Sequence, residues 1–526
     1  MRRRVHALAV PALLAVYTGI LYWRALAAGV ISDGWVLLGI GSRGLREAPF
    51  VLLPAHTIPV ANLFMAVLWK LFGLHQLGYQ VVNLAELALV GGLLHAAGRA
   101  LFGQPRVALL ASLLFLANSS FYEVPFWPGV GNFQSLAALL YLAGLLALAR
   151  AFRSPHPWPW TALFSLCGLA AFFTYEPAVS LLGVGVLYAF LQDRDAGRRR
   201  WPGVLAAVLP ALAVVLGSKL YTAGLGYHAM FPPHDAAGLR LRLYRLVRGC
   251  VALFTLMGSD DRLYRLLTFG LLPPFGSPAL NLLIAVWALG LVAGGALLAW
   301  RARSPAARFT VLWLAAHLLT VGATTEVVSR HLYLAALPAS LLLSWGIWSA
   351  ADRLADRLSR GRERAAAVLA GAALVLLVAG ALPDLGAAAA VYREASAASN
   401  QVAALVRRRL AVEPAAPPRV VLVNLPALLA RDGVSAYAFG NGLPQLLRLS
   451  TGGRVSRAEL FYTDDAAGLG RPARPSAPIT PGELAARVAD PGSLVLVFDP
   501  WTCALTRLNR LVRHRAPGDV ARPVNQ

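Results

Sequence analysis

Two carboxylates in this sequence stand beside apolar stretches. Asp33 lies in "ISDGWVLL", just after the first long apolar stretch, and Glu123 lies in "FYEVPFWPG", between aromatic residues. Ionisable side chains in such positions are costly to keep and commonly functional. A carboxylate can take a proton from a hydroxyl group during a reaction. Asp33 and Glu123 are therefore candidate catalytic residues.

A cationic pair and a third carboxylate occur later in the chain. The stretch "SRHLYL" contains Arg330 and His331, and "FFTYEP" contains Glu176. The planar guanidinium group of arginine matches the oxygens of a phosphate group, so Arg330, helped by His331, is a candidate phosphate ligand. Taken singly, each of these residues could also be an ordinary solvated loop charge.

The aromatic residues that flank Glu123 have two interpretations. They would suit contact with a sugar or a lipid headgroup. They would equally suit an interfacial belt, in which aromatic side chains mark the depth of the lipid headgroups. Composition alone leaves both interpretations open for Phe121, Tyr122, Phe126 and Trp127.

The composition is that of an integral membrane protein. Of the 526 residues, 58% are hydrophobic and only 14% are charged, and the mean hydropathy is +0.60. Apolar runs of roughly 18 to 25 residues recur through the first 380 positions or so, each long enough for a helix to cross the bilayer. The net charge of +23 is carried almost wholly by Arg. In a multispan protein such charge sets orientation, so it does not imply a nucleic-acid partner.

The arginine clusters predict how the chain crosses the membrane. Short cytoplasmic loops retain Arg, and "DRDAGRRR" is the clearest loop of this kind. With the N-terminus in the cytoplasm, about 11 spans follow, and the loops that carry the candidate residues fall on the external side. The last span, at about 365 to 382, leaves the C-terminal segment outside. The expected location is the inner membrane of a bacterium.

Two domains are expected. The first, residues 1–382, is an all-α polytopic membrane domain, and the second, residues 383–526, is a small external α/β domain. In the second domain "RVVLVNLP" and "GSLVLVFDP" are continuous apolar runs bounded by turn residues. That pattern is typical of buried parallel strands.

No motif identifies a cofactor. Cys167, Cys250 and Cys503 share no metal-like spacing, and the histidines of "GYHAMFPPHD" match no metal signature. A divalent metal ion stays possible, but no clear ligand set supports one. Because the sequence has no P-loop, nucleophile elbow or dinucleotide fingerprint in a suitable context, hydrolase and ATPase functions are disfavoured.

Several stretches of the first 350 residues or so resemble, in order, the GT-C class of membrane glycosyltransferases. The nearest resemblance is to the transmembrane O-mannosyltransferase-like group that carries tetratricopeptide repeats. The stretches are "SDGWVLL", "LFGLHQLGYQVVNLAELALVGGLLHAAGRALFG", "FLANSSFYEVPFWPGVGN", "FFTYEPAVSLL" and "SRHLYLAALPASLLL".

The resemblance implies transfer of a sugar from a polyprenyl-phosphate-linked donor to a glycan, lipid or protein acceptor at the external face. A physical argument agrees with this, because no nucleotide sugar is available outside and the donor must arrive in the lipid. Transfer then needs a base for the acceptor hydroxyl, cations for the departing phosphate and an apolar groove for the lipid. The implied roles are catalytic for Asp33 and Glu123, donor-phosphate binding for Arg330 and His331, and substrate binding for Trp127, Glu176 and Tyr333.

The sequence departs from the pattern of that group in three ways. Gly34 stands where a second acidic residue is frequent, and Tyr175 stands where a Lys precedes the later Glu. The tetratricopeptide repeats are absent, replaced by the α/β segment. A transporter or flippase of lipid-linked glycans is the alternative, in which the same polar residues would line a path, and a noncatalytic scaffold is a third.

Overall fold

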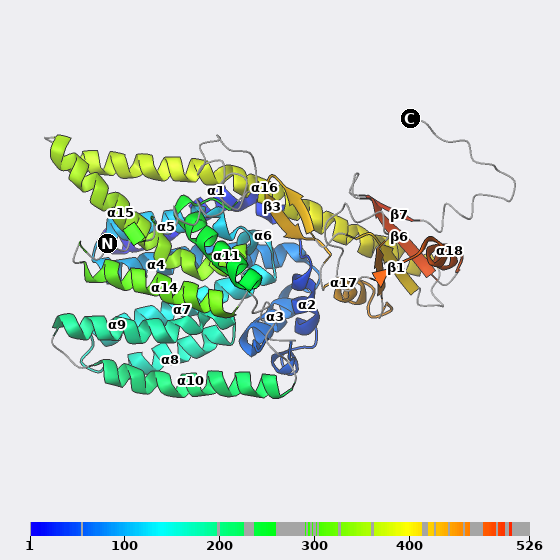
Figure 1. Cartoon of the computed structure of the whole chain (residues 1–526), viewed down its shortest axis with the longest axis horizontal. Coiled ribbons are helices and arrows are strands. Elements are labelled where there is room, and N and C mark those ends of the chain that lie inside the picture. The colour runs from blue at the N-terminus through cyan, green and yellow to red at the C-terminus, as the bar shows by residue number, and fades with distance from the viewer. Residues whose placement is uncertain are drawn as a thin grey trace.

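The structure is a computed structural model in which a bundle of long helices adjoins a small unit that contains β-strands (Figure 1). One very long helix, α16 (Arg362–Val412), runs from the bundle into that unit. The described residues are 2–53, 56–196, 200–225, 236–258, 304–324, 328–358, 362–412, 419–425, 428–439, 442–455, 458–462, 477–490, 493–499 and 504–507, with a few single residues between 290 and 301.

The bundle consists of helices at the positions that hydropathy predicts. Each expected span except the eighth, which falls outside the described residues, coincides with a helix. Seven helices in the described part of the chain are long and apolar enough to cross a membrane. The bundle helices are α1 (Arg2–Tyr22), α4 (Gln76–Phe102), α5 (Pro105–Ala117), α7 (Val130–Ala151), α8 (Trp158–Phe172), α9 (Ser180–Ala196), α10 (Trp201–Gly224), α14 (Pro305–Thr324), α15 (Tyr333–Leu358) and the first part of α16.

Small and hydroxylated residues let these helices approach one another closely. The Ser112 hydroxyl on α5 donates to the carbonyl of Gly91 on α4 at 2.9 Å, and the Ser344 hydroxyl on α15 donates to the carbonyl of Val107 at 2.7 Å. Such contacts are typical of helices packed within a membrane, where apolar burial alone does not drive association.

Short elements gather at one end of the bundle and between its spans. They include α2 (Asp33–Gly41), α3 (Pro59–Phe72), α6 (Glu123–Phe126) and α11 (Ala236–Thr255), together with the 3₁₀ turns η1 (Trp23–Ala27), η2 (Ala48–Phe50), η3 (Ser119–Phe121), η4 (Glu176–Val179) and η5 (Ser329–Leu332). All of the predicted site residues except Trp127 and Tyr333 lie in these short elements. Those two residues directly follow α6 and η5.

The C-terminal unit has the parallel strands expected from its apolar runs. Strand β1 (Arg419–Val423) pairs in parallel with β4 (Ala458–Tyr462) on one side and β6 (Ser493–Asp499) on the other. The sheet order is β5-β4-β1-β6-β7, and β7 (Ala504–Arg507) is antiparallel to β6. The remaining elements are β5 (Ala477–Pro478), α17 (Leu443–Ser450), α18 (Pro481–Ala489) and a hairpin of β2 (Leu428–Arg431) and β3 (Val434–Tyr437).

Helix α16 connects the two parts without a break. The expected boundary between residues 382 and 383 falls inside this helix, so the C-terminal unit begins with the second half of α16. Both strands of the β2–β3 hairpin pack against α16, beside the end of the bundle that carries α2 (Figure 1). The hairpin is thus placed next to the short elements that hold the predicted site.

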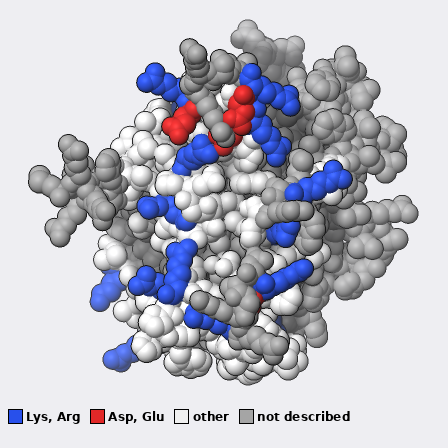
Figure 2. All heavy atoms as spheres, turned by 90° about the vertical axis from the view of Figure 1, so that its left-hand side faces the viewer, with Lys and Arg blue, Asp and Glu red and all other residues white. Residues whose placement is uncertain are grey.

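The opposite end of the bundle is rich in arginine. Figure 2 shows Lys and Arg spread over this face, with Asp and Glu confined to small areas. The N-terminus and the turns between α4 and α5, α7 and α8, and α9 and α10 lie at this end (Figure 1). This is the end that the sequence places in the cytoplasm, and that orientation stays a prediction.

Candidate functional site

The predicted site residues meet at the end of the bundle that faces the C-terminal unit. Here α6, η3 and η5 contact one another, α17 packs on α2, and the β2–β3 hairpin lies along α16. The site therefore draws on five separate parts of the chain. Sequence reasoning expected one external surface built from several loops. The structure brings these loops together, and the external position stays a prediction.

The central interaction is an ion pair between Glu123 and Arg330. Nη1 of Arg330 donates to Oε2 of Glu123 at 3.0 Å, and the backbone N–H of Arg330 donates to the same oxygen at 3.1 Å. The Glu123 side chain is 4% exposed, whereas that of Arg330 is 21% exposed. Glu123 is thus a buried anchor, and the Arg330 side chain is partly exposed.

Two aromatic rings flank the Arg330 guanidinium. Its central carbon lies 5.4 Å from the ring centroid of Trp127 and 5.5 Å from that of Tyr437. The two rings are stacked on each other, with centroids 5.4 Å apart and an interplanar angle of 28°. A cation over aromatic faces is attracted by their quadrupoles, so Trp127 and Tyr437 help to fix the guanidinium. Trp127 is itself fixed, because its Nε1 donates to the carbonyl of Ile31 at 2.9 Å.

Asp33 is the first residue of α2 and is partly buried. Its charge acts on the Arg330 guanidinium, as does that of Glu123. A carboxylate in the first turn of a helix also interacts favourably with the helix dipole. The two predicted catalytic carboxylates therefore lie around one cation, Glu123 in contact with it and Asp33 within electrostatic range.

Polar side chains of α4 form hydrogen bonds to the backbone of the turn that carries Glu123. The amides of Gln80 and Asn83 donate to the carbonyls of Pro125 at 2.6 Å and Val124 at 2.8 Å. Asn132 accepts the backbone N–H of Gly129 at 2.8 Å and donates to Oε2 of Glu86 at 3.1 Å. Glu86, which the sequence places in the bundle interior, is buried there and supports this network.

A second polar cluster surrounds Glu176. Its Oε1 accepts the backbone N–H of Thr57 at 3.0 Å and pairs with Nζ of Lys219, and its Oε2 lies 3.4 Å from Nδ1 of His56. Burial would raise the pKa of the Glu176 carboxyl, but its hydrogen bond to His56 and the charges of His56 and Lys219 outweigh burial and lower that pKa. Glu176 is therefore an ionised carboxylate that pairs with Lys219 and contacts His56.

Tyr175 joins the two clusters. Its ring stacks against that of His331, with centroids 6.4 Å apart and an interplanar angle of 26°. Burial raises the pKa of the Tyr175 hydroxyl, and the charges of Arg330, Glu123 and Glu176 also act on it. The structure thus brings His331 and Glu176 to the same region as Arg330.

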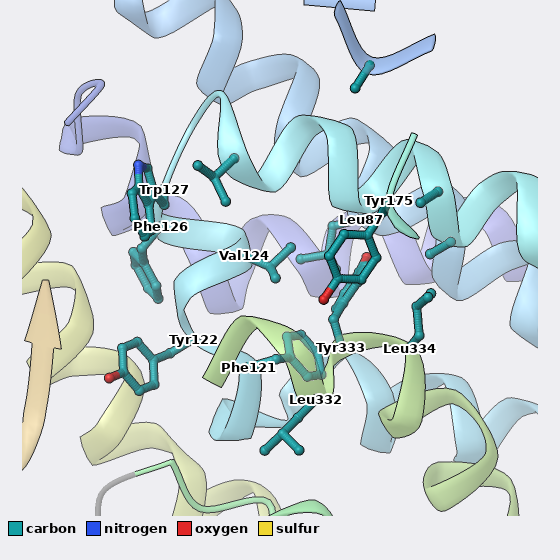
Figure 3. Close-up of a cluster of buried hydrophobic side chains, with 14 of the residues drawn as sticks. Leu87, Phe121, Tyr122, Val124, Phe126, Trp127, Tyr175, Leu332, Tyr333 and Leu334 are labelled. Atoms are coloured by element: carbon teal, nitrogen blue, oxygen red, sulfur yellow. The ribbon is translucent and has the colours of Figure 1, made fainter. Parts of the chain in front are cut away.

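Tyr333 lies among apolar side chains instead. Its ring is 1% exposed and packs against Phe121 and Phe115, with centroids 4.9 and 5.5 Å away. Its hydroxyl lies 3.4 Å from the Ser135 hydroxyl. Figure 3 shows Tyr333 beside Phe121 and Leu332, with Trp127 further away, beyond Val124. This packing accounts for Tyr333 without a substrate.

The described residues hold no group of three or more His, Cys, Asp or Glu that could bind a metal ion. His228, His234 and Asp235 lie outside those residues. Position 34 has no room for a second carboxylate, since a Cβ atom on Gly34 would lie 2.8 Å from the carbonyl oxygen of Pro128. The paired acidic residues of the resembling group therefore do not fit here.

Sequence reasoning missed three residues of these clusters. Tyr437 belongs to a strand expected in a separate domain, and His56 stands in an amphipathic stretch without a motif. Lys219 could have been noticed, because it is one of only two lysines in the chain and lies near the predicted external end of a span. Its ammonium group pairs with Glu176.

Comparison with known proteins adds evidence on the fold. No family model and no curated protein matches the sequence. Among solved structures, ArnT from Cupriavidus metallidurans in the apo state is similar over 94% of this chain and 93% of its own, at 12% identity and a TM-score of 0.51. This likeness shows a shared fold and confirms the expected GT-C architecture, a multispan helical domain followed by a small sheet-containing unit.

Two further structures score lower. ArnT from Cupriavidus metallidurans bound to undecaprenyl phosphate has a TM-score of 0.49 at 14% identity, covering 98% of this chain and 96% of its own. The archaeal oligosaccharyltransferase AglB from Archaeoglobus fulgidus, in complex with an inhibitory peptide and a dolichol-phosphate, has a TM-score of 0.48 at 12% identity. That match covers 85% of this chain and 64% of AglB.

Proposed function

We propose that this protein transfers a sugar from a polyprenyl-phosphate-linked donor to an acceptor at the external face of a bacterial inner membrane. The observation that carries the proposal is the arrangement around Arg330. The partly exposed side chain of Arg330, the buried carboxylate of Glu123 that anchors it and the less buried carboxylate of Asp33 lie together. They are at the end of the bundle away from the arginine-rich face. A GT-C fold places such a group in the setting where a lipid-linked donor can reach it.

The roles follow from burial. Glu123 is a positioning residue, since its Oε2 is occupied by the side chain and backbone of Arg330. Asp33 is the general base, because it is the more exposed of the two carboxylates. As the acceptor oxygen attacks the anomeric carbon, its proton passes to Asp33 and a glycosidic bond forms. The bond between that carbon and the donor phosphate breaks, and polyprenyl phosphate leaves with the electron pair.

Cations stabilise the departing phosphate in this scheme. The planar guanidinium group of Arg330 donates to the phosphate oxygens. The aromatic rings of Trp127 and Tyr437 hold this group in place. His331 and the Glu176–Lys219 pair stand close by as further substrate contacts. The sugar, the acceptor and the lipid chain length are left open.

A transporter or flippase of lipid-linked glycans is the second candidate, because polar residues can also line a path. The two functions differ in their products. Purified protein in vesicles should release polyprenyl phosphate from a lipid-linked sugar when an acceptor extract is present, and the label should move to the acceptor. Movement of intact donor between leaflets, without release of polyprenyl phosphate, would support transport instead.

A further inference from the structure

A cleft lined by basic residues opens at the arginine-rich end of the bundle, far along the helices from the candidate site. Its volume is about 410 Å³. The lining comes from the last turns of α4 and α7 and the turn after α7, with the basic residues His95, Arg99, Arg150 and Arg153. The described lining residues include no Asp or Glu, so the cleft carries a concentrated positive charge.

Two arginines of the cleft, Arg150 and Arg153, are held by groups other than carboxylates in the part of the chain that the structure describes. Nη2 of Arg153 donates to the carbonyl of Ala100 at 2.7 Å, which ties the turn after α7 to the end of α4. The guanidinium carbon of Arg150 lies 5.8 Å from the ring centroid of Trp160. Among the described residues, no carboxylate forms an ion pair with Arg99, Arg150 or Arg153. By contrast, Arg106 at the same end is neutralised by both oxygens of Asp352, at 3.2 and 2.7 Å.

Aromatic residues place the cleft at the level of lipid headgroups. Trp158 at the start of α8 is 66% exposed, and the ring of Trp160, two residues further along, lies under Arg150. Tryptophan is enriched where a membrane meets water, so this edge of the bundle lies at the interface. The rest of the lining is apolar and consists of Ala96, Ala100, Leu146 and Ala149.

We propose that this cleft binds the phosphate headgroup of an anionic phospholipid from the adjacent leaflet. The arginines match the charge of the headgroup, the apolar lining suits the first part of an acyl chain, and basic pockets between membrane helices commonly hold such lipids. The bound lipid would join α4 to α7. Because α4 also carries Gln80 and Asn83, this lipid would steady the helix that supports the Glu123 turn.

The test uses the full-length protein, purified in detergent and stripped of lipid. Native mass spectrometry measures the binding of phosphatidylglycerol and of phosphatidylcholine with the same acyl chains. Wild type should bind phosphatidylglycerol at least about tenfold more tightly. Each basic residue near the membrane surface contributes about fivefold, so Arg99→Gln and Arg150→Gln should each lose about that much, and the double variant about 30-fold.

The matched control is Arg353→Gln, which removes the same charge from an exposed position at the same end but outside the cleft. Its affinity should stay within about threefold of wild type, since charges outside the cleft contribute little. An equal loss in Arg353→Gln, or unchanged binding in both single variants, would overturn the proposal. Displacement of the lipid by inorganic phosphate at equal concentration would assign the cleft to the free anion and would overturn it too.

Discussion

Asp33 and Glu123 look alike in the sequence, but their surroundings differ in the structure. Both are carboxylates beside an apolar stretch, and the sequence makes each a candidate base. Glu123 is 3% exposed and paired with Arg330, whereas Asp33 begins a helix and is only partly buried. Burial and pairing separate the two roles, and neither property can be read from local sequence.

The Arg330→Lys variant tests whether the guanidinium shape matters. Lysine keeps the charge but cannot bridge two oxygens in a plane or present a flat group to the rings of Trp127 and Tyr437. We expect the rate of sugar transfer to fall at least about tenfold, with a raised KM for the donor. Steady-state kinetics with purified enzyme measure this.

Arg431→Lys is the matched control for that substitution. Arg431 forms an exposed pair with Glu394 at 2.8 Å, and exposed pairs contribute little to stability. Its kinetics should equal those of wild type. If Lys at position 330 is equally harmless, a point charge is enough there and the role in planar phosphate recognition is wrong.

The structure groups the charged residues that the sequence singled out, whereas the aromatic ones are divided. Arg330, His331 and Glu176 are conspicuous because ionisable groups are rare in an apolar chain, and they lie in one region. A motif resemblance assigned Tyr333 to substrate binding. In the structure its side chain points toward Phe115 and Phe121, and this direction cannot be read from the motif. Tyr437 was missed because its contact with Trp127 joins positions more than 300 residues apart.

At the scale of elements, the close approach of α2 to the turn after α6 fixes the distance between Asp33 and Arg330. Gly34 and Gly129 make this approach possible. Gly129 has φ +91°, and a Cβ atom there would lie 3.0 Å from Cα of Gly34. Because the backbones of α2 and of the turn after α6 are in contact here, a larger residue at either glycine would force a backbone to shift.

Gly34→Ala should therefore destabilise the protein. The added methyl group would lie 2.8 Å from the Pro128 carbonyl oxygen and 2.9 Å from Cγ1 of Val30. A cost of about 1 to 3 kcal/mol is typical of such overpacking. Thermal unfolding of the detergent-solubilised protein measures it.

Gly92→Ala provides the comparison, since a Cβ atom on this α4 glycine would meet nothing within 4 Å. Alanine favours a helix over glycine, so this variant should be as stable as wild type or slightly more stable. Equal stability of the Gly34 and Gly92 variants would show that the α2 contact is looser than described.

The β2–β3 hairpin completes the candidate site through Tyr437. Tyr437→Ala removes the ring that stacks on Trp127 and flanks Arg330, and it should raise the KM for the donor about three- to tenfold. Tyr437→Phe keeps the ring and should stay within about twofold of wild type. An unchanged KM in Tyr437→Ala would exclude the hairpin from the site.

Elements were more predictable than their ends. Hydropathy located the spans, and apolar runs located β1 and β6, because both signals are long and continuous. The sequence ended the last span near 382, yet α16 continues to Val412. The extension is rich in alanine, which favours a helix without high hydropathy, so the loss of hydropathy did not mark the end of the helix.

At the scale of the whole molecule, the two ends of the bundle differ in charge. The arginine-rich end shown in Figure 2 is opposite the candidate site. Positive charge near the ends of spans is held in the cytoplasm during insertion. We therefore predict that the candidate site and the C-terminal unit lie outside the cytoplasm.

Cysteine labelling tests this orientation. In a variant with the native cysteines replaced, Ala430→Cys on the exposed β2 strand should react with an impermeant thiol reagent in intact spheroplasts. His156→Cys, on the exposed turn between α7 and α8, should react only after lysis. The reverse pattern would invert the topology and place the site in the cytoplasm.

The central claim is that Asp33 serves as the base in transfer from a lipid-linked sugar, and one rate comparison tests it most directly. Purified Asp33→Asn, which keeps the size of the side chain, should insert normally and bind the lipid-linked donor as wild type does. Its rate of sugar transfer should be at least about a hundredfold lower, as for the loss of a general base. A rate within a few-fold of wild type would contradict the account.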